Sequence, residues 1–158
     1  MEINVWVEKE FEKYLEANWL EGVAEQVLLV EDISFTVDLG LAIVGKEKIC
    51  QLNSSYLGRD QPTDVLAFSM LPREDRISFV SPPDGIQHLG EVVITYPQAV
   101  IQAEESCHSV KKEIAILIIH GLLHLLGYEH NRPELKEQMI AREAKILGHV
   151  ERGIGFGS

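Results

Sequence analysis

Apolar positions along the chain follow two different periods, which predict a mixture of strands and helices. Alternating or β-branched-rich runs bounded by turn residues predict strands over residues 3–7, 33–37, 41–44, 65–70 and 89–95. Apolar residues spaced three and four apart predict helices over residues 10–20, 23–30, 46–57, 97–107, 110–126 and 133–147. No repeat or linker divides the chain, so we expect residues 1–158 to form a single domain.

Three connecting segments are predicted from their composition. Residues 38–40, Asp-Leu-Gly, separate the second and third predicted strands, so we expect a hairpin there. Residues 72–87 are rich in Pro, Asp, Ser and Arg, which predicts a mobile surface loop long enough to act as a lid. The C-terminal residues 153–158, GIGFGS, are expected to be frayed.

The composition indicates a globular chain with a large core and an acidic surface. Its 158 residues are 46% apolar, which is enough for one domain with a sizeable core. The formal net charge is -11, which argues against non-specific binding of nucleic acids through bulk charge. A polyanionic substrate would therefore have to be attracted by a local basic patch or by a metal ion.

The sequence contains no visible targeting or membrane signal. Its N-terminus, MEINVWVEKEFEKY, lacks a basic region followed by an apolar core, and the longest apolar run is too short to cross a membrane. Cys50 and Cys107 have no paired spacing and are expected to be reduced, buried thiols, although a disulfide between them is a less favoured alternative. These features predict a cytoplasmic protein.

The segment His120–His130, HGLLHLLGYEH, contains three of the six histidines of the chain. On a helix His120 and His124 differ by about 40° in azimuth and by roughly 6 Å along the axis, so both imidazoles lie on one face. Gly127 favours a helix end, after which the chain can turn back and deliver His130. Three histidines at this spacing predict an open tetrahedral zinc site.

Two other interpretations of this segment are less well supported by its residues. A histidine on an apolar helix is usually a core residue with a satisfied hydrogen bond, but three of them around a glycine are hard to explain in that way. The spacing also matches that of metzincin proteases, which have a glutamate as general base directly after the first histidine. Here that position is Gly121, so proteolysis is disfavoured and a base must come from elsewhere.

Other polar residues are weaker candidates on their own. Arg59 is the only basic residue between Lys48 and Arg73, and by itself it is best explained as a surface charge. Thr63 and Asp64 stand where a cap or turn is expected before a strand. The remaining histidines have no ligand spacing and are expected to be exposed; they are His88, His108 and His149.

The motifs HGLLHLLGYEH, RDQPTDVLAF and LGEVVIT, taken together, resemble the YbeY family of bacterial endoribonucleases. This resemblance implies an α+β fold in which a mixed sheet of about four strands packs with helices beside a central zinc-ligand helix. It implies one zinc ion per chain on His120, His124 and His130, and a catalytic role for Arg59. Glu91 and Glu129 stand where the family usually has aspartate, and both are candidates to orient ligand histidines, although Glu129 is equally well explained as a solvated turn residue.

The function implied by the resemblance is cleavage of single-stranded RNA. It includes maturation of the 3′ end of small-subunit ribosomal RNA and ribosome quality control, with the ribosome or small-subunit proteins as partners. Two alternatives stay open from the residues alone. One is a zinc hydrolase acting on a peptide or small-molecule bond, which Gly121 disfavours. The other is a ribosome-associated factor with a structural zinc, which would need a fourth protein ligand, for example Cys107.

Overall fold

The computed structural model describes residues 2–33, 36–57, 64–69, 86–128 and 132–156. The strands in this part of the chain are β1 (Glu2–Val7), β2 (Thr36–Val44), β3 (Val65–Ser69) and β4 (Ile86–Thr95). The helices are the 3-10 turn η1 (Lys9–Phe11) and the α-helices α1 (Ala17–Val30), α2 (Lys46–Leu57), α3 (Tyr96–Glu105), α4 (Val110–Leu125) and α5 (Pro133–Gly153).

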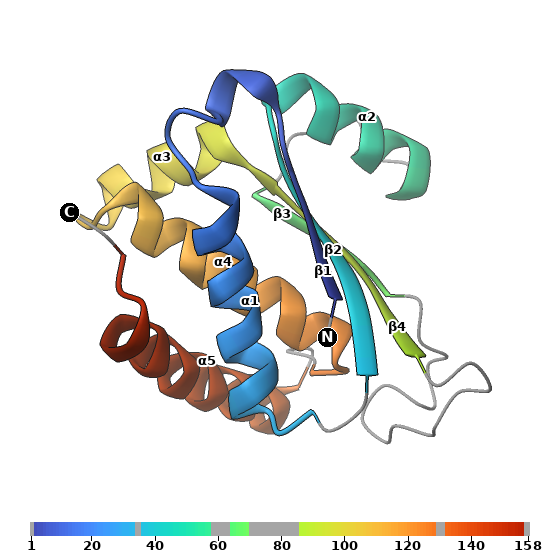
Figure 1. Cartoon of the computed structure of the whole chain (residues 1–158), viewed down its shortest axis with the longest axis vertical. Coiled ribbons are helices and arrows are strands. Elements are labelled where there is room, and N and C mark those ends of the chain that lie inside the picture. Colours follow the sequence, from blue (N-terminus) through green and yellow to red (C-terminus); the bar gives the residue numbers. More distant parts are fainter. Residues whose placement is uncertain (1, 34–35, 58–63, 70–85, 129–131, 157–158) are drawn as a thin grey trace.

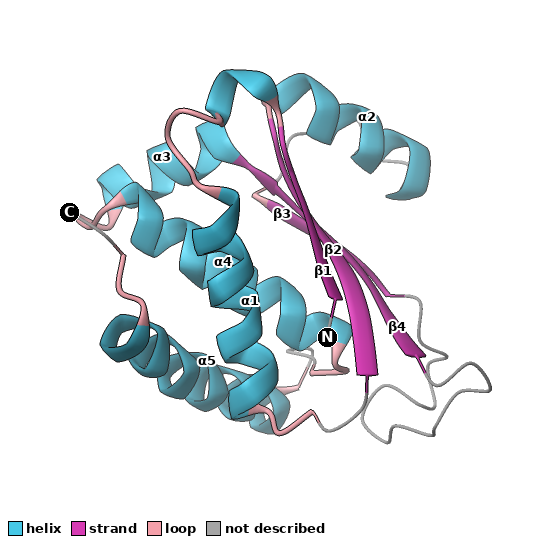
Figure 2. Ribbon diagram, viewed as in Figure 1, coloured by secondary structure: helices cyan, strands magenta, loops and turns pink. Residues whose placement is uncertain are grey.

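The four strands form one mixed sheet in the order β1-β2-β4-β3. β2 pairs in parallel with both β1 and β4, whereas β3 is antiparallel to β4. Helices α1, α4 and α5 lie on one side of the twisted sheet and α2 lies on the other (Figures 1 and 2). The prediction of an α+β fold with a mixed sheet of about four strands is therefore confirmed.

Helix α4 occupies the centre of the larger core. It packs against α1, α3, α5, β3 and β4, and its residues Ile114, Ile118 and Leu122 have at most 1% exposed surface. A helix that is apolar on nearly all sides must be buried on nearly all sides. The smaller core, between the sheet and α2, contains Val44, Ile49, Leu66 and Val93.

The hairpin predicted at residues 38–40 is wrong. Residues 36–44 form one uninterrupted strand, β2, in which Gly40 pairs with Asn4 on one side and Glu91 on the other. The central position of β2 explains the difference, because hydrogen bonds to two parallel neighbours outweigh the local turn preference of Asp and Gly. A Cβ atom at Gly40 would lie 3.1 Å from Cγ of Glu91, so the small residue also makes room for that side chain.

The helix predicted over residues 10–20 is also wrong, and so is its separation from the one predicted over 23–30. The structure has a short 3-10 turn, η1, followed by the single helix α1 that passes through Gly22. Space for a side chain at Gly22 is taken by Ile154, whose Cδ1 atom would be 3.3 Å from a Cβ at this position. The glycine therefore serves close packing inside a helix rather than a break between two helices.

The other predicted helices and strands are found, with small shifts at their ends. The largest shift is in α5, which continues to Gly153 instead of ending at residue 147. The tail expected to be frayed is docked as far as residue 156, because Trp19 Nε1 donates to the Gly155 carbonyl at 2.8 Å and Phe156 packs on the core. Most of the predicted loop 72–87 lies outside the described residues. No helix in the described part of the chain could span a membrane.

Candidate metal centre

The two histidines of the central helix lie close to each other near its C-terminal end. The Nε2 atoms of His120 and His124 are 3.1 Å apart, and both side chains are partly exposed. Two nitrogens that bind one tetrahedral zinc ion at about 2.0–2.1 Å stand about 3.3–3.4 Å apart. The pair therefore has nearly the separation that a shared zinc ion requires, and its donor atoms fit this metal.

A third ligand is not present among the described residues. In that part of the chain no group of three or more His, Cys, Asp and Glu residues could hold a metal ion. The predicted third ligand, His130, lies outside it, as does Glu129. Ligation of zinc by His120, His124 and His130 thus stays a prediction, of which the structure describes the first two members.

Glu143 of α5 is a partner of the histidine pair that sequence analysis missed. Its Oε1 atom is 2.9 Å from Nδ1 of His120. An ionised carboxylate only accepts hydrogen bonds, so Nδ1 of His120 donates and its Nε2 atom is left for His124 and a metal. The sequence shows only that Glu143 is one of several carboxylates on a predicted helix. No pattern around it indicates which carboxylate contacts His120.

Glu91 does not take the orienting role expected of it. In a strand, successive side chains point to opposite faces of the sheet. Val92 points toward α4, since its Cγ1 atom would lie 2.7 Å from a Cβ at Gly121. The exposed side chain of Glu91 therefore lies on the face of the sheet turned away from the histidines.

Helix α4 approaches the sheet closely at Gly121, which explains why this position has no side chain that could act as a general base. Gly121 is buried against the sheet, and a Cβ there would also lie 3.3 Å from Cγ2 of Val65. Any side chain at Gly121 would therefore force Val92 to shift. Packing of α4 against the sheet thus disfavours a glutamate at this position.

Helix α4 ends at the turn predicted from Gly127. This glycine has a φ of 104°, the Tyr128 N–H donates to the Leu123 carbonyl at 3.0 Å, and the Gly127 N–H donates to the His124 carbonyl at 3.1 Å. This pair of bonds is a Schellman motif, which closes the helix and redirects the chain. The expected helix end is confirmed, and the chain leaves it toward residues 129–131.

A second polar network fixes this turn against two helices. Nε of Arg142 donates to Oε2 of Glu31 at 2.8 Å, and Nη2 donates to the Val30 carbonyl at 3.4 Å. Tyr128 shares this carboxylate: burial first, and then its side-chain hydrogen bond to Glu31, raise the pKa of Tyr128. The network joins the C-terminal end of α1, the middle of α5 and the turn after α4.

The other candidate residues lie elsewhere or outside the described part. Arg59 and Thr63 fall in residues 58–63, between α2 and β3, and are not described. Asp64 directly precedes β3, and its Oδ1 atom accepts from the Val65 N–H at 2.8 Å, as expected of a cap or turn residue. His149 is exposed as predicted. His88 is exposed and bound to Asp38.

Neither cysteine lies near the histidine pair. Both are free thiols; Cys107 is exposed, contrary to the expectation of a buried thiol, and Cys50 is half-buried. Cys107 precedes the N-terminus of α4, and the helix rises roughly 15 Å between Val110 and His120. A fourth ligand from Cys107 is therefore excluded by distance.

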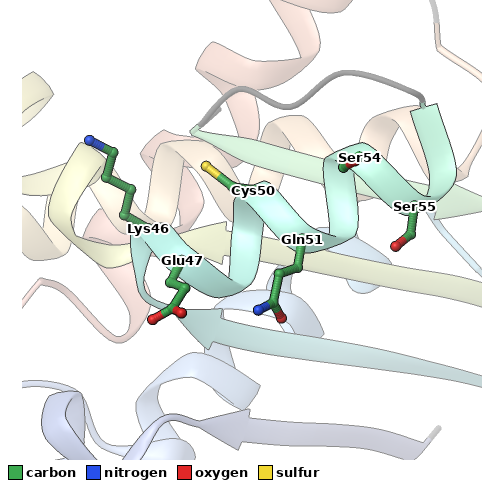
Figure 3. A pocket seen from close by; sticks show the side chains of 6 residues that line it. All are labelled: Lys46, Glu47, Cys50, Gln51, Ser54 and Ser55. Atoms are coloured by element: carbon green, nitrogen blue, oxygen red, sulfur yellow. The ribbon is translucent and has the colours of Figure 1, made fainter.

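An open hollow of about 690 Å³ runs along α2 (Figure 3). The residues that line it are Lys46, Glu47, Cys50, Gln51, Ser54 and Ser55. It belongs to the side of the sheet opposite α4 (Figure 1), so it is separate from the histidine pair.

Comparison with known proteins gives one family. Residues 3–151 match the family model described as endoribonuclease YbeY. Curated relatives named endoribonuclease YbeY include one from Dehalococcoides mccartyi, 41% identical over 155 residues, which cover 95% of this chain and 97% of the relative. Another, from Roseiflexus castenholzii, is 39% identical over 92% of this chain and 91% of its own length.

A solved structure supports the same fold. The solution structure of a structural-genomics target from Thermotoga maritima superposes with a TM-score of 0.64. It is 24% identical in sequence and covers 94% of this chain and 89% of its own length. At this identity the similarity speaks for the fold alone.

Proposed function

This chain belongs to the YbeY family of endoribonucleases, and on that premise we propose that it is a zinc-dependent enzyme that cuts single-stranded RNA. Its proposed role is maturation of the 3′ end of small-subunit ribosomal RNA and ribosome quality control in the cytoplasm. The observation that supports this most strongly is the approach of the His120 and His124 Nε2 atoms to 3.1 Å. The proposed zinc site adds His130, three residues beyond the turn at Gly127.

The chemistry follows from the donor set. When bound, zinc supplies Lewis-acid chemistry toward a phosphodiester, since three neutral imidazoles leave its double positive charge uncompensated. His120 presents Nε2 because its Nδ1 atom is held by Glu143. Arg59 is proposed to place two parallel N–H donors on the charge that builds up on phosphate oxygens in the transition state.

The acidic surface limits how RNA is bound. With a net charge of -11, the chain should make few phosphate contacts away from its metal and Arg59. A flexible single strand can enter such a local site more readily than a duplex. We therefore propose weak binding of free RNA, with targeting by the ribosome or a small-subunit protein.

Two alternative functions are less well supported. A zinc peptidase of the metzincin type needs a glutamate at position 121, where Val92 leaves no space. A structural zinc site with four protein ligands would need a further donor, and Cys107 lies beyond the opposite end of α4.

The decisive experiment is substitution of Arg59. Arg59→Ala should keep zinc and fold but lose RNA cleavage by about two orders of magnitude, because a transition-state donor is removed. Arg59→Lys should restore only part of the activity, since an ammonium lacks the planar pair of donors. Cleavage is measured on matched single- and double-stranded oligoribonucleotides, with and without a chelator, and the exposed Arg152→Ala serves as the control.

The same assay tests the substrate. Binding of single strands across a salt series should have a logarithmic slope of only about 2–3, as expected for few phosphate contacts. Full activity in Arg59→Ala would show that Arg59 is an ordinary surface charge without a catalytic role. Preference for the duplex would contradict the single-strand assignment.

A further inference from the structure

We propose that Glu143 is a positioning residue for the metal centre, which fixes the tautomer and ring orientation of His120 so that Nε2 faces His124. This inference rests on the zinc site of the proposed function. The Glu143 Oε1 atom lies 2.9 Å from His120 Nδ1, and the side chains are 26% and 34% exposed respectively. The contact joins residues 23 positions apart, on α5 and α4.

The need for a positioning residue follows from the chemistry of imidazole. A neutral histidine has one protonated and one unprotonated ring nitrogen, and only the unprotonated one binds a metal. A carboxylate that accepts from Nδ1 keeps the proton there, leaves the lone pair on Nε2 and makes that nitrogen more basic. In this chain the same bond also aims Nε2 of His120 at His124, at 3.1 Å.

The carboxylate can do this because α5 is itself held in place. Arg142, the neighbouring residue on α5, is bound to Glu31 at the end of α1. The Glu31 side chain is only 5% exposed, and Tyr128 of the turn after α4 shares it. Two adjacent residues of α5 therefore act on two parts of one centre: Glu143 on the first histidine and Arg142 on the turn that leads to residue 130.

A purely structural role would have a different signature. A partly exposed pair of this kind adds little to the free energy of unfolding, because water and salt screen it. Its effect on a metal ligand is larger, since loss of a partner behind a ligand histidine typically lowers metal affinity 10- to 100-fold. Glu143 should therefore control the affinity for the metal and which ring nitrogen of His120 carries the proton, rather than the thermal stability.

The test compares Glu143→Ala and Glu143→Gln with Glu151→Gln, which changes an exposed glutamate of the same helix. Zinc affinity is measured by competition with a chromogenic chelator. We expect it to fall roughly 10- to 100-fold in Glu143→Ala. The loss in Glu143→Gln should be smaller, because an amide oxygen still accepts from Nδ1. The Glu151→Gln control should bind zinc like the wild type.

A second measurement needs neither RNA nor metal. Long-range ¹H–¹⁵N spectra of the metal-free protein should show His120 protonated at Nδ1 in the wild type and shifted toward Nε2 protonation in Glu143→Ala. An unchanged tautomer, or zinc affinity equal to that of Glu151→Gln, would overturn the role of Glu143. Absence of RNA cleavage in a wild-type protein that binds zinc would overturn the proposed function alone.

Discussion

The two ends of the central helix α4 each hold a histidine–glutamate pair, and the pairs differ in what surrounds them. Near the N-terminal end, Nε2 of His108 is 2.7 Å from Oε1 of Glu113. Near the C-terminal end, Nδ1 of His120 is 2.9 Å from Oε1 of Glu143. By residue type and distance the two contacts are nearly the same.

The two histidine–glutamate pairs differ in how deeply they are buried and in which other groups they bind. Oε2 of Glu113 accepts from Gln102 at 2.9 Å, so both of its oxygens are used within the interface of α3 and α4. The Glu113 side chain is only 8% exposed. At the other end His120 is 34% exposed and turns its second nitrogen toward another histidine.

This comparison shows that the pair alone does not define a role. A carboxylate that binds a histidine stabilises an interface when the cluster is closed and buried. In our proposal the same contact prepares a ligand when the second ring nitrogen points at another donor beside solvent. The distinction can be tested by changing equivalent residues at the two ends.

The largest difference is expected between His124→Ala and His108→Ala. If His124 is a direct ligand, as proposed, its removal should lower zinc affinity by more than the roughly 100-fold that loss of an outer partner costs. His108→Ala should bind zinc like the wild type, because His108 lies beyond the opposite end of α4. Zinc content after dialysis, measured by atomic emission, checks both. Equal zinc content in the two variants would remove the functional distinction between the ends.

The second largest effect is expected at the N-terminal end of α4, where a substitution should lower the stability of the protein but leave zinc binding unchanged. Glu113→Ala leaves His108 and Gln102 without their acceptor in a buried interface and should cost roughly 2 kcal/mol of unfolding free energy. Glu105→Ala, an exposed glutamate at the end of α3, is the matched control and should cost far less. Urea unfolding of the metal-free proteins measures both. Weaker zinc binding in Glu113→Ala would show that the two ends are coupled.

Features decided by local geometry were predictable from the sequence. His120 and His124 are one helical turn apart, so their shared face follows from helix geometry alone. The helix end at Gly127 follows equally from the conformational freedom of glycine, and its φ is 104°. Short runs that alternate or are rich in β-branched residues likewise predicted β1, β3 and β4.

Features decided by packing between distant segments were not predictable. Glu143 meets His120 only because α5 packs on α4, and α5 carries several other carboxylates. His108 was expected to be exposed, but it folds back on Glu113 and is only 19% exposed. In β2, Asp38 and Gly40 have turn preferences that pairing with β1 and β4 overrides.

The smallest effect should come from Ser109, the cap at the start of α4. Its Oγ atom accepts from the Lys112 N–H at 3.1 Å, so Ser109→Ala should cost about 1 kcal/mol of unfolding free energy. Ser109→Asp should keep the cap and add a favourable charge at the helix N-terminus. Ser106→Ala is the control, because Ser106 ends α3 through its backbone N–H. The cap lies at the N-terminal end of α4, away from the histidine pair. Urea unfolding should therefore show a loss of stability in Ser109→Ala, while its zinc affinity stays unchanged. A change in both quantities would contradict the separation of the two ends of α4.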